Sequence, residues 1–286
     1  MLSHRLAFIL ILQLGTANLL QCAVNAESPN ASIHSSKNPQ PHSITKSTSA
    51  QAGSKADKGE PTGSTITSAC TEAQLWALAC PALLAENNGH RHDLLWCLPA
   101  TEENIKKEKR ALSEWWGINS REDLLKNLNW LVSGGHREQF DNLVKFALGT
   151  AQLDESNQAL SQQSPQEFEE KLKLAKEYAP QLGFKSLLGW DYCRYIALCR
   201  WGTLCGYMSQ EEAWQRIMPA ARLLQNSFPS WKDLGANYLM GRRFWRGDTK
   251  AQENFEKCYK TLLTDPNSPW VKIPWKTNLA AVKQKQ

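Results

Sequence analysis

The sequence predicts an all-α protein whose folded part is a single helical domain of about eight or nine helices, over residues 68–275. Apolar residues recur there at spacings of three and four, as in amphipathic helices, and no segment shows the sustained alternation of a strand. Several segments also begin with Ser followed three positions later by an acidic residue, which marks the start of a helix. All twelve Trp lie after residue 75, in agreement with a folded domain in this part of the chain.

The composition bounds the class of protein. The chain has 286 residues, of which 42% are hydrophobic and 21% charged, enough for a globular core. The 33 basic residues exceed the 28 acidic ones by five, an excess too small to indicate nucleic acid as a partner. No apolar run reaches the roughly 18 residues that a membrane-spanning helix needs. Collagen-like, coiled-coil and fully disordered proteins are also excluded by composition.

Residues 1–26 are typical of a secretory signal peptide. A short positive start precedes the apolar run 6–14, and Val24-Asn25-Ala26 is acceptable to a signal peptidase. We therefore expect an exported protein, periplasmic or secreted. Lipid anchoring at Cys22 is a minor alternative, because the residues before it resemble a lipobox except at Gln21.

Residues 27–67 are predicted to form a disordered linker. Of these 41 residues, 21 are Ser, Thr, Pro or Gly, and none is aromatic. Such a segment cannot bury enough apolar surface to offset the entropy lost on ordering.

The first helices of the domain are expected over residues 71–86 and over residues 102–116. Pro81 should interrupt the helix in the first of these segments. The basic run KKEKR at 106–110 in the second of these is predicted to be a solvated helix face.

The next helix should open at Ser120, which forms a capping pair with Asp123, and end at the Gly134-Gly135 pair. A further helix then follows over 136–149.

The second half of the domain continues in the same way. Ser164, Ser209 and Ser230 are predicted helix caps, and Asp248 should cap the last helix. Residues 186–205 are the most apolar segment of the domain.

After Asp265 the helical pattern stops in a segment with three Pro. Trp270 and Trp275 in this segment predict that it packs back onto the domain, because each indole has about 200 Å² to bury. Residues 276–286 are predicted to be a flexible basic tail.

Two charged residues stand in the most apolar segment. On a helix Asp191 and Arg194 share a face, and burying either one alone would be costly. A buried ion pair that fixes helix register, with Trp190 or Trp201 stacked on the guanidinium, is one interpretation. The other is a polar pocket in which Arg194 meets an anionic group and Asp191 orients it.

The runs LGWDYCR, ALCRWG, GYMSQEEAW and FPSWKDLGANYLMGRRFW follow one another in the second half of the chain, and WWGINSREDLLKNLNWLVSGGHREQF precedes them. Together they resemble the bacterial domain of unknown function 1266, the YbeU/YbeR-like family, over about residues 112–275. The resemblance implies no activity, because this family has no established one to carry over.

Several polar residues of these runs would form a His/Asp/Arg pocket if packing brought them together. They are His136, Arg137, Asp191, Arg194, Arg200 and Arg242. Such a pocket could support acid–base chemistry on an anionic substrate, or it could bind a ligand without reaction. His136 by itself is more typical of a helix start or a surface position.

Seven Cys follow the signal peptide, so at least one thiol is left unpaired or available to another chain. Cys193, Cys199 and Cys205 are spaced by six on one helix, cannot pair with their neighbours in the series, and are predicted to lie in the core. Cys80 and Cys97 are the disulfide candidate. The loop at 90–93 between those two is predicted to be solvated and matches no zinc pattern.

Seven of the Trp lie in helix-like segments among apolar neighbours and are predicted to pack in the core. These are Trp116, Trp130, Trp190, Trp201, Trp214, Trp231 and Trp245.

Three hypotheses for function follow. The first is a non-catalytic helical module that binds a protein partner or a small anionic ligand. The second is a hydrolase or transferase that uses His136, Asp191 and Arg194. The third is a toxin, effector or immunity component. The sequence contains no phosphate loop, no nucleophile elbow and no zinc-binding helix motif, so we expect no cofactor and no metal.

Overall fold

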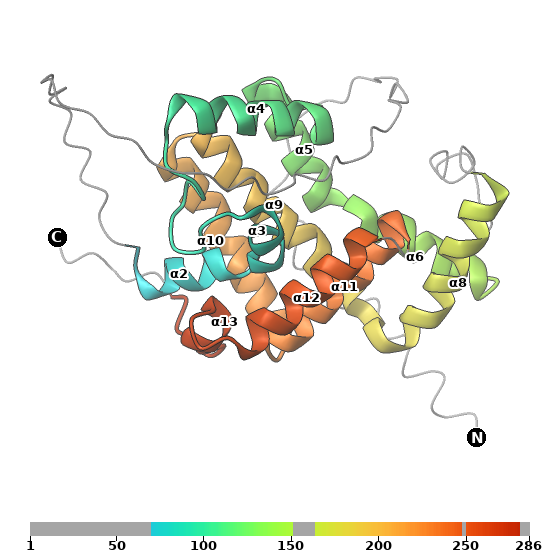
Figure 1. The fold of residues 1–286 in the computed structure, drawn as a ribbon. Coiled ribbons are helices and arrows are strands. Elements are labelled where there is room, and N and C mark those ends of the chain that lie inside the picture. The colour runs from blue at the N-terminus through green and yellow to red at the C-terminus, as the bar shows by residue number, and fades with distance from the viewer. Residues whose placement is uncertain (1–69, 151–163, 248–249, 281–286) are drawn as a thin grey trace, which may run out of the picture. The chain divides into compact units, whose positions relative to one another are not determined.

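The computed structural model describes residues 70–150, 164–247 and 250–280. No strand occurs in these ranges, and nine of their helices have eight or more residues, so the all-α prediction is confirmed (Figure 1). The predicted signal peptide 1–26, the linker 27–67 and the cap at Asp248 lie outside the described residues.

In chain order the elements are α2 (Glu72–Ala79), α3 (Ala82–Asn88), α4 (Glu102–Trp116), α5 (Arg121–Ser133), α6 (Gly135–Ala147), α8 (Pro165–Leu182), the short 3-10 helix η3 (Gly183–Lys185), α9 (Leu188–Leu204), α10 (Gln210–Ser227), α11 (Trp231–Arg246), α12 (Lys250–Thr264) and α13 (Pro269–Lys272). None of the described helices has the length and apolar character needed to cross a membrane.

Four of the predicted helix starts, those with a Ser cap, are the observed ones. Ser120, Ser164, Ser209 and Ser230 each accept a hydrogen bond from the backbone N–H three positions ahead. Each hydroxyl satisfies one of the N–H groups that a helix start leaves without an internal partner. Pro81 separates α2 from α3, as expected of a residue that cannot continue a helix.

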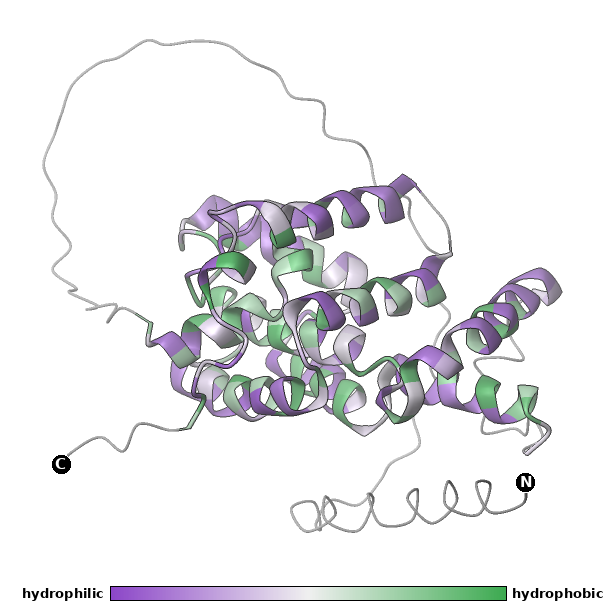
Figure 2. Cartoon of the chain, turned by 90° about the horizontal axis from the view of Figure 1, so that it is seen from below, coloured by the Kyte–Doolittle hydropathy of each residue, from purple (hydrophilic) through white to green (hydrophobic). Residues whose placement is uncertain are grey.

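Helix α9 is the centre of the domain. Of its 17 residues, 15 are buried, because it packs against α10 and α11 and also against α3, α4, α5 and α6 (Figure 1). The surrounding helices carry both hydrophilic and hydrophobic residues, so each has one side for the core and one for solvent (Figure 2). The approach of α11 to α9 depends on Gly241, because a Cβ there would collide with the Cβ of Trp190.

The start of α9 is held by a side chain of α11 rather than by its own sequence. The amide of Asn237 is buried, accepts a hydrogen bond from the Gly189 N–H over 2.7 Å and donates one to the Ser186 carbonyl over 2.7 Å. This bridge satisfies two buried backbone groups at once.

We expect Asn237→Ala to lower the free energy of unfolding by about 2 kcal/mol, because both backbone groups would lose a buried partner. Urea unfolding followed by circular dichroism measures this loss. The matched control is Asn127→Ala, whose half-buried amide bonds the carbonyls of Trp116 and Asp123 and should cost less. Equal losses in the two variants would contradict the role given to Asn237.

The Pro-rich segment after α12 packs back onto the domain, as predicted. The rings of Trp270 and Trp231 stack with centroids 6.0 Å apart, and Trp270 Nε1 donates to the Ala79 carbonyl over 2.8 Å. The prediction of a flexible tail from residue 276 is wrong for residues 276–280. Leu279 is buried there, because its chain lies along α10, where Gln225 donates to the Thr277 carbonyl over 2.8 Å.

Candidate functional site

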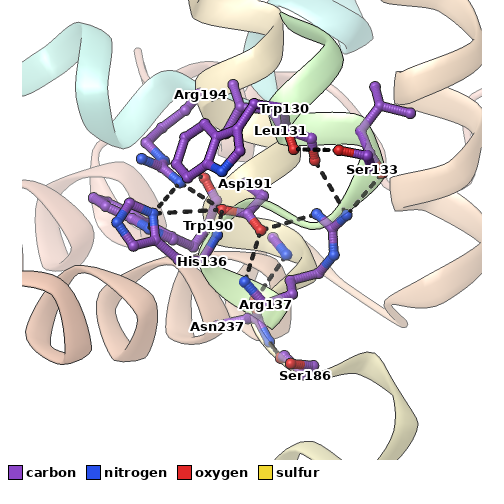
Figure 3. A network of polar contacts seen from close by, with 12 residues as sticks. Trp130, Leu131, Ser133, His136, Arg137, Ser186, Trp190, Asp191, Arg194 and Asn237 are labelled. Atoms are coloured by element: carbon purple, nitrogen blue, oxygen red, sulfur yellow. Dashed lines mark hydrogen bonds and ion pairs between the residues drawn. The ribbon is translucent and has the colours of Figure 1, made fainter. Parts of the chain in front are cut away.

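The carboxylate of Asp191 is fully buried and is the acceptor at the centre of a polar network (Figure 3). The backbone N–H groups of His136 and Arg137 donate to its two oxygens over 3.2 and 3.1 Å. Arg137 Nη1 donates to Oδ2 over 2.9 Å, and Arg194 Nη2 donates to Oδ1 over 2.5 Å. Asp191 of α9 therefore caps the N-terminus of α6, whose N–H groups attract negative charge.

The Gly134-Gly135 pair makes this cap possible. It ends α5 as predicted and also starts α6. Gly135 has a φ of +59°, and a Cβ at this position would collide with the Asp191 carboxylate. A glycine is thus required here both by backbone conformation and by the close approach of the acid.

Arg194 holds the other side of the carboxylate. Its Nε donates to the Trp190 carbonyl over 3.1 Å, and its guanidinium lies 4.1 Å from the centre of the Trp190 ring. The expected ion pair with Asp191 is formed, and Trp190 rather than Trp201 is the indole that stacks on the guanidinium.

His136 lies at the outer edge of the network, with 17% of its side chain exposed. Its Nδ1 accepts hydrogen bonds from Arg194 Nη2 over 2.8 Å and from Trp190 Nε1 over 3.3 Å. Burial and the charges of Arg194 and Lys171 hold the pKa of His136 well below its usual value. The ring is therefore neutral, and because Nδ1 accepts, its proton is on Nε2.

The ion pairs of the network join two guanidinium groups to one carboxylate. Arg137 donates from Nη2 to the carbonyls of Leu131 and Val132 over 3.1 Å each, which closes the end of α5. With His136 neutral, the Asp191 carboxylate pairs with both Arg137 and Arg194. The carboxyl of Asp141 lies close enough to interact with Arg137, and burial raises the pKa of Asp141.

Five indoles and a third guanidinium are linked to His136 and Arg194 by ring contacts and cation–π contacts. We call this set the indole surface: Trp115, Trp116, Trp130, Trp190, Trp245 and Arg246. The prediction that seven Trp pack in the core is correct for three buried ones, Trp190, Trp201 and Trp231. It is wrong for Trp130, which is 38% exposed, and the other three are partly buried against the core: Trp116, Trp214 and Trp245.

The other two members of the predicted pocket lie elsewhere, so the six-residue pocket is corrected to four. Arg200 is six residues after Arg194, which turns it to another side of α9, where Nη2 donates to the carbonyls of Arg91 and Leu94 over 2.5 and 2.9 Å. Arg242 donates to Gln252 Oε1 over 2.8 Å and lies over the Phe255 ring, joining α11 to α12.

A second buried cluster was not expected from the sequence. His90, predicted to be solvated, has 8% of its side chain exposed, and its Nδ1 accepts a hydrogen bond from Trp201 Nε1 over 3.2 Å. Its Nε2 lies 3.6 Å from Glu108 Oε2. Glu108 is the middle residue of the KKEKR run, so the prediction of a fully solvated face is wrong at this position. Burial raises the pKa of Glu108 to about 7 and lowers the pKa of His90 to about 4.

The cysteines of the described region are free thiols. The expected bond between Cys80 and Cys97 is not formed, and Cys80 Sγ instead lies 3.7 Å from the Trp76 carbonyl, one helical turn before it. Cys193, Cys199 and Cys205 are buried, as predicted for core residues. The described residues contain no group of three His, Cys, Asp or Glu side chains suited to holding a metal ion.

Comparison with known families identifies the family of this chain. The family model described as Protein of unknown function (DUF1266) matches residues 111–275, more than half of the chain. The chain belongs to this family. The resemblance seen in the sequence runs is thereby confirmed, and the family's description assigns no activity.

Two relatives come from Escherichia coli strain K12. The chain is 28% identical to the uncharacterized protein YbeR over 145 residues, which are 47% of this chain and 57% of YbeR. It is 26% identical to the uncharacterized protein YbeU over 182 residues, which are 63% of this chain and 73% of YbeU. The chain thus spans little more than half the length of YbeR. No solved structure matches it.

The DUF1266 match contains the Asp191 network and the whole indole surface, whereas His90 and Glu108 precede it. The sequence identified His136, Arg137, Asp191 and Arg194, but it missed Trp115 and Arg246. The one feature of the sequence that could have indicated them is their position at a helix end. Trp115 is next to the last residue of α4, and Arg246 is the last residue of α11.

Proposed function

We propose that the DUF1266 domain of this protein is a non-catalytic binding module that holds an anionic group at His136, on the outer edge of the Asp191 network. The observation that carries the proposal is the state of His136. Its Nδ1 already accepts two hydrogen bonds, so the partly exposed ring offers a donor at Nε2, next to two guanidinium groups that pair with a single carboxylate.

The same state of His136 argues against the enzyme hypothesis. A general base needs a free lone pair and a pKa near the working pH. In His136 the lone pair of Nδ1 is engaged, and burial together with Arg194 keeps the pKa well below the usual value. The ring is suited to donating a hydrogen bond to a bound anion, and it is poorly suited to exchanging a proton with a substrate.

The proposal includes an extracytoplasmic setting. It rests on residues 1–26 as an export signal and on residues 27–67 as a linker that would leave the binding domain free to reach its ligand. No observation on the described residues favours the toxin, effector or immunity hypothesis.

We expect the full chain to bind inorganic phosphate at low salt in isothermal titration calorimetry, and His136→Phe to weaken this binding about tenfold. The Phe ring keeps the shape of the site but removes the donor, and hydrogen bonds to charged groups are worth about 1.5–3 kcal/mol.

The matched control is His92→Phe. His92 lies in the 90–93 loop, pairs with Glu86 of α3 and does not belong to the Asp191 network. Circular dichroism establishes that both variants fold. Equal phosphate affinity in wild type and His136→Phe, or no heat at millimolar phosphate, would overturn the proposal.

A further inference from the structure

We infer that the ligand of this site is a small organic anion with a flat ring, which stacks on the exposed indoles while its anionic group meets the cationic edge. The inference rests on the anion site proposed above and adds the class of ligand to it. It is carried by the arrangement of the indole surface around His136 and Arg194.

Ring contacts and cation–π contacts link the members of this surface to His136 and Arg194. The His136 ring lies between Trp130 and Trp245, with centroid distances of 5.2 and 6.5 Å. The Arg246 guanidinium then links two indoles, lying 4.7 Å from the Trp245 ring and 5.7 Å from the Trp115 ring.

Arg194 links two further indoles, because it lies 5.4 Å from the Trp116 ring and 5.8 Å from the Trp130 ring. The linked residues come from α4, α5, α6, α9 and α11, so five helices contribute to this set. Such convergence of side chains from distant parts of the chain is typical of a ligand site rather than of a single helix face.

The two outermost indoles are exposed to an unusual degree. Trp115 is 44% exposed and Trp130 is 38% exposed, whereas Trp76, Trp190 and Trp231 are buried. An exposed indole leaves a large apolar face in water, and each of these two lies beside a guanidinium group, Trp115 beside Arg246 and Trp130 beside Arg194. Exposed indole faces next to guanidinium groups suit a ring with an acidic substituent, because the ring stacks and the acid pairs with the cations.

Three probes of similar size test this class. Benzoate has a flat ring and a negative charge, cyclohexanecarboxylate keeps the charge but has a puckered ring, and benzamide keeps the flat ring without the charge. We expect calorimetry on the full chain to give benzoate an affinity about fivefold or more above that of either other probe, as aromatic stacking allows.

Fluorine NMR of protein labelled with 5-fluorotryptophan locates the ring. Trp115→Leu and Trp130→Leu identify the two resonances, and because neither Trp is buried, both variants should fold. We expect these two resonances to shift with benzoate and each variant to bind benzoate about fivefold more weakly. The matched control is Trp214→Leu, a half-buried Trp of α10, which should leave benzoate affinity unchanged.

The outcomes separate the two proposals. If benzoate and cyclohexanecarboxylate bind equally, or if the two resonances do not move, the flat-ring inference is overturned while the anion site stands. If benzamide binds as tightly as benzoate, charge plays no part in binding the ring, and the inference fails while the phosphate titration alone decides the anion site. If phosphate binds but benzoate does not, the site accepts anions only without a ring, and the inference fails alone.

Discussion

Asp191→Asn is expected to lower the free energy of unfolding by about 3–5 kcal/mol, the usual cost of removing one partner of a buried ion pair. The variant keeps the shape of the side chain but loses its charge. The buried Arg194 and the half-buried Arg137 would then lack their carboxylate, and because Asn keeps a single oxygen, one of the two N–H groups at the start of α6 would lose its acceptor. Few single changes in the domain affect as many buried groups.

Urea unfolding of wild type and variant, followed by circular dichroism, measures the loss. The control is Glu212→Gln, which removes a carboxylate that pairs with Arg121 and Arg216 nearer the surface. Because solvent screens those pairs, the control should show a clearly smaller loss. If Asp191→Asn were as stable as Glu212→Gln, the Asp191 network would not hold α6 on α9 as described.

Glu108→Gln is expected to remove a pH dependence of stability of about 3 kcal/mol. Burial raises the pKa of Glu108 from its usual 4.5 to about 7. In the unfolded chain the group ionises near pH 4.5, whereas in the folded domain it keeps its proton until about pH 7. The stabilisation that this proton provides is complete below pH 4.5 and is lost as the pH rises through 7.

The variant should therefore gain stability relative to wild type as the pH rises from 5 to 8, because Gln mimics the protonated acid at every pH. The difference between the two unfolding free energies isolates this contribution from that of His90, which titrates in both proteins. The control is Glu114→Gln on the same helix, an exposed residue that pairs with Arg110 and should show no such trend. A wild type and Glu108→Gln that keep a constant difference in stability across this range would contradict the burial of Glu108.

Local structure was predictable to a high degree. The helix that follows Thr101 occupies the expected residues 102–116, and the four Ser caps accept the hydrogen bonds expected of them. These features depend on groups no more than four positions apart in the chain, so the sequence contains all the information needed. The pairing of Asp191 with Arg194 was predictable for the same reason, since helical spacing brings the two together.

The candidate site was predictable only in part. His136 meets Asp191 across 55 positions of sequence, and only the packing of α6 on α9 brings them together. Arg200 lies in the same helix as Arg194 and in similar sequence surroundings, yet it donates hydrogen bonds to the carbonyls of Arg91 and Leu94 instead. Residue type and spacing suggested one site for both, whereas the direction in which each side chain leaves the helix separates them.

The sequence alone determined the all-α class, the starts of the helices that a Ser side chain caps, and the need of Asp191 for a cationic partner. The tertiary structure decided which indoles are buried and which basic residues converge. It also decided that Glu108 is buried, although its neighbours in the chain are basic. The physical reason is the range of the forces involved. Hydrogen bonds within a helix join near neighbours in the chain, whereas burial and charge pairing depend on which helices meet, and that is a property of the whole domain.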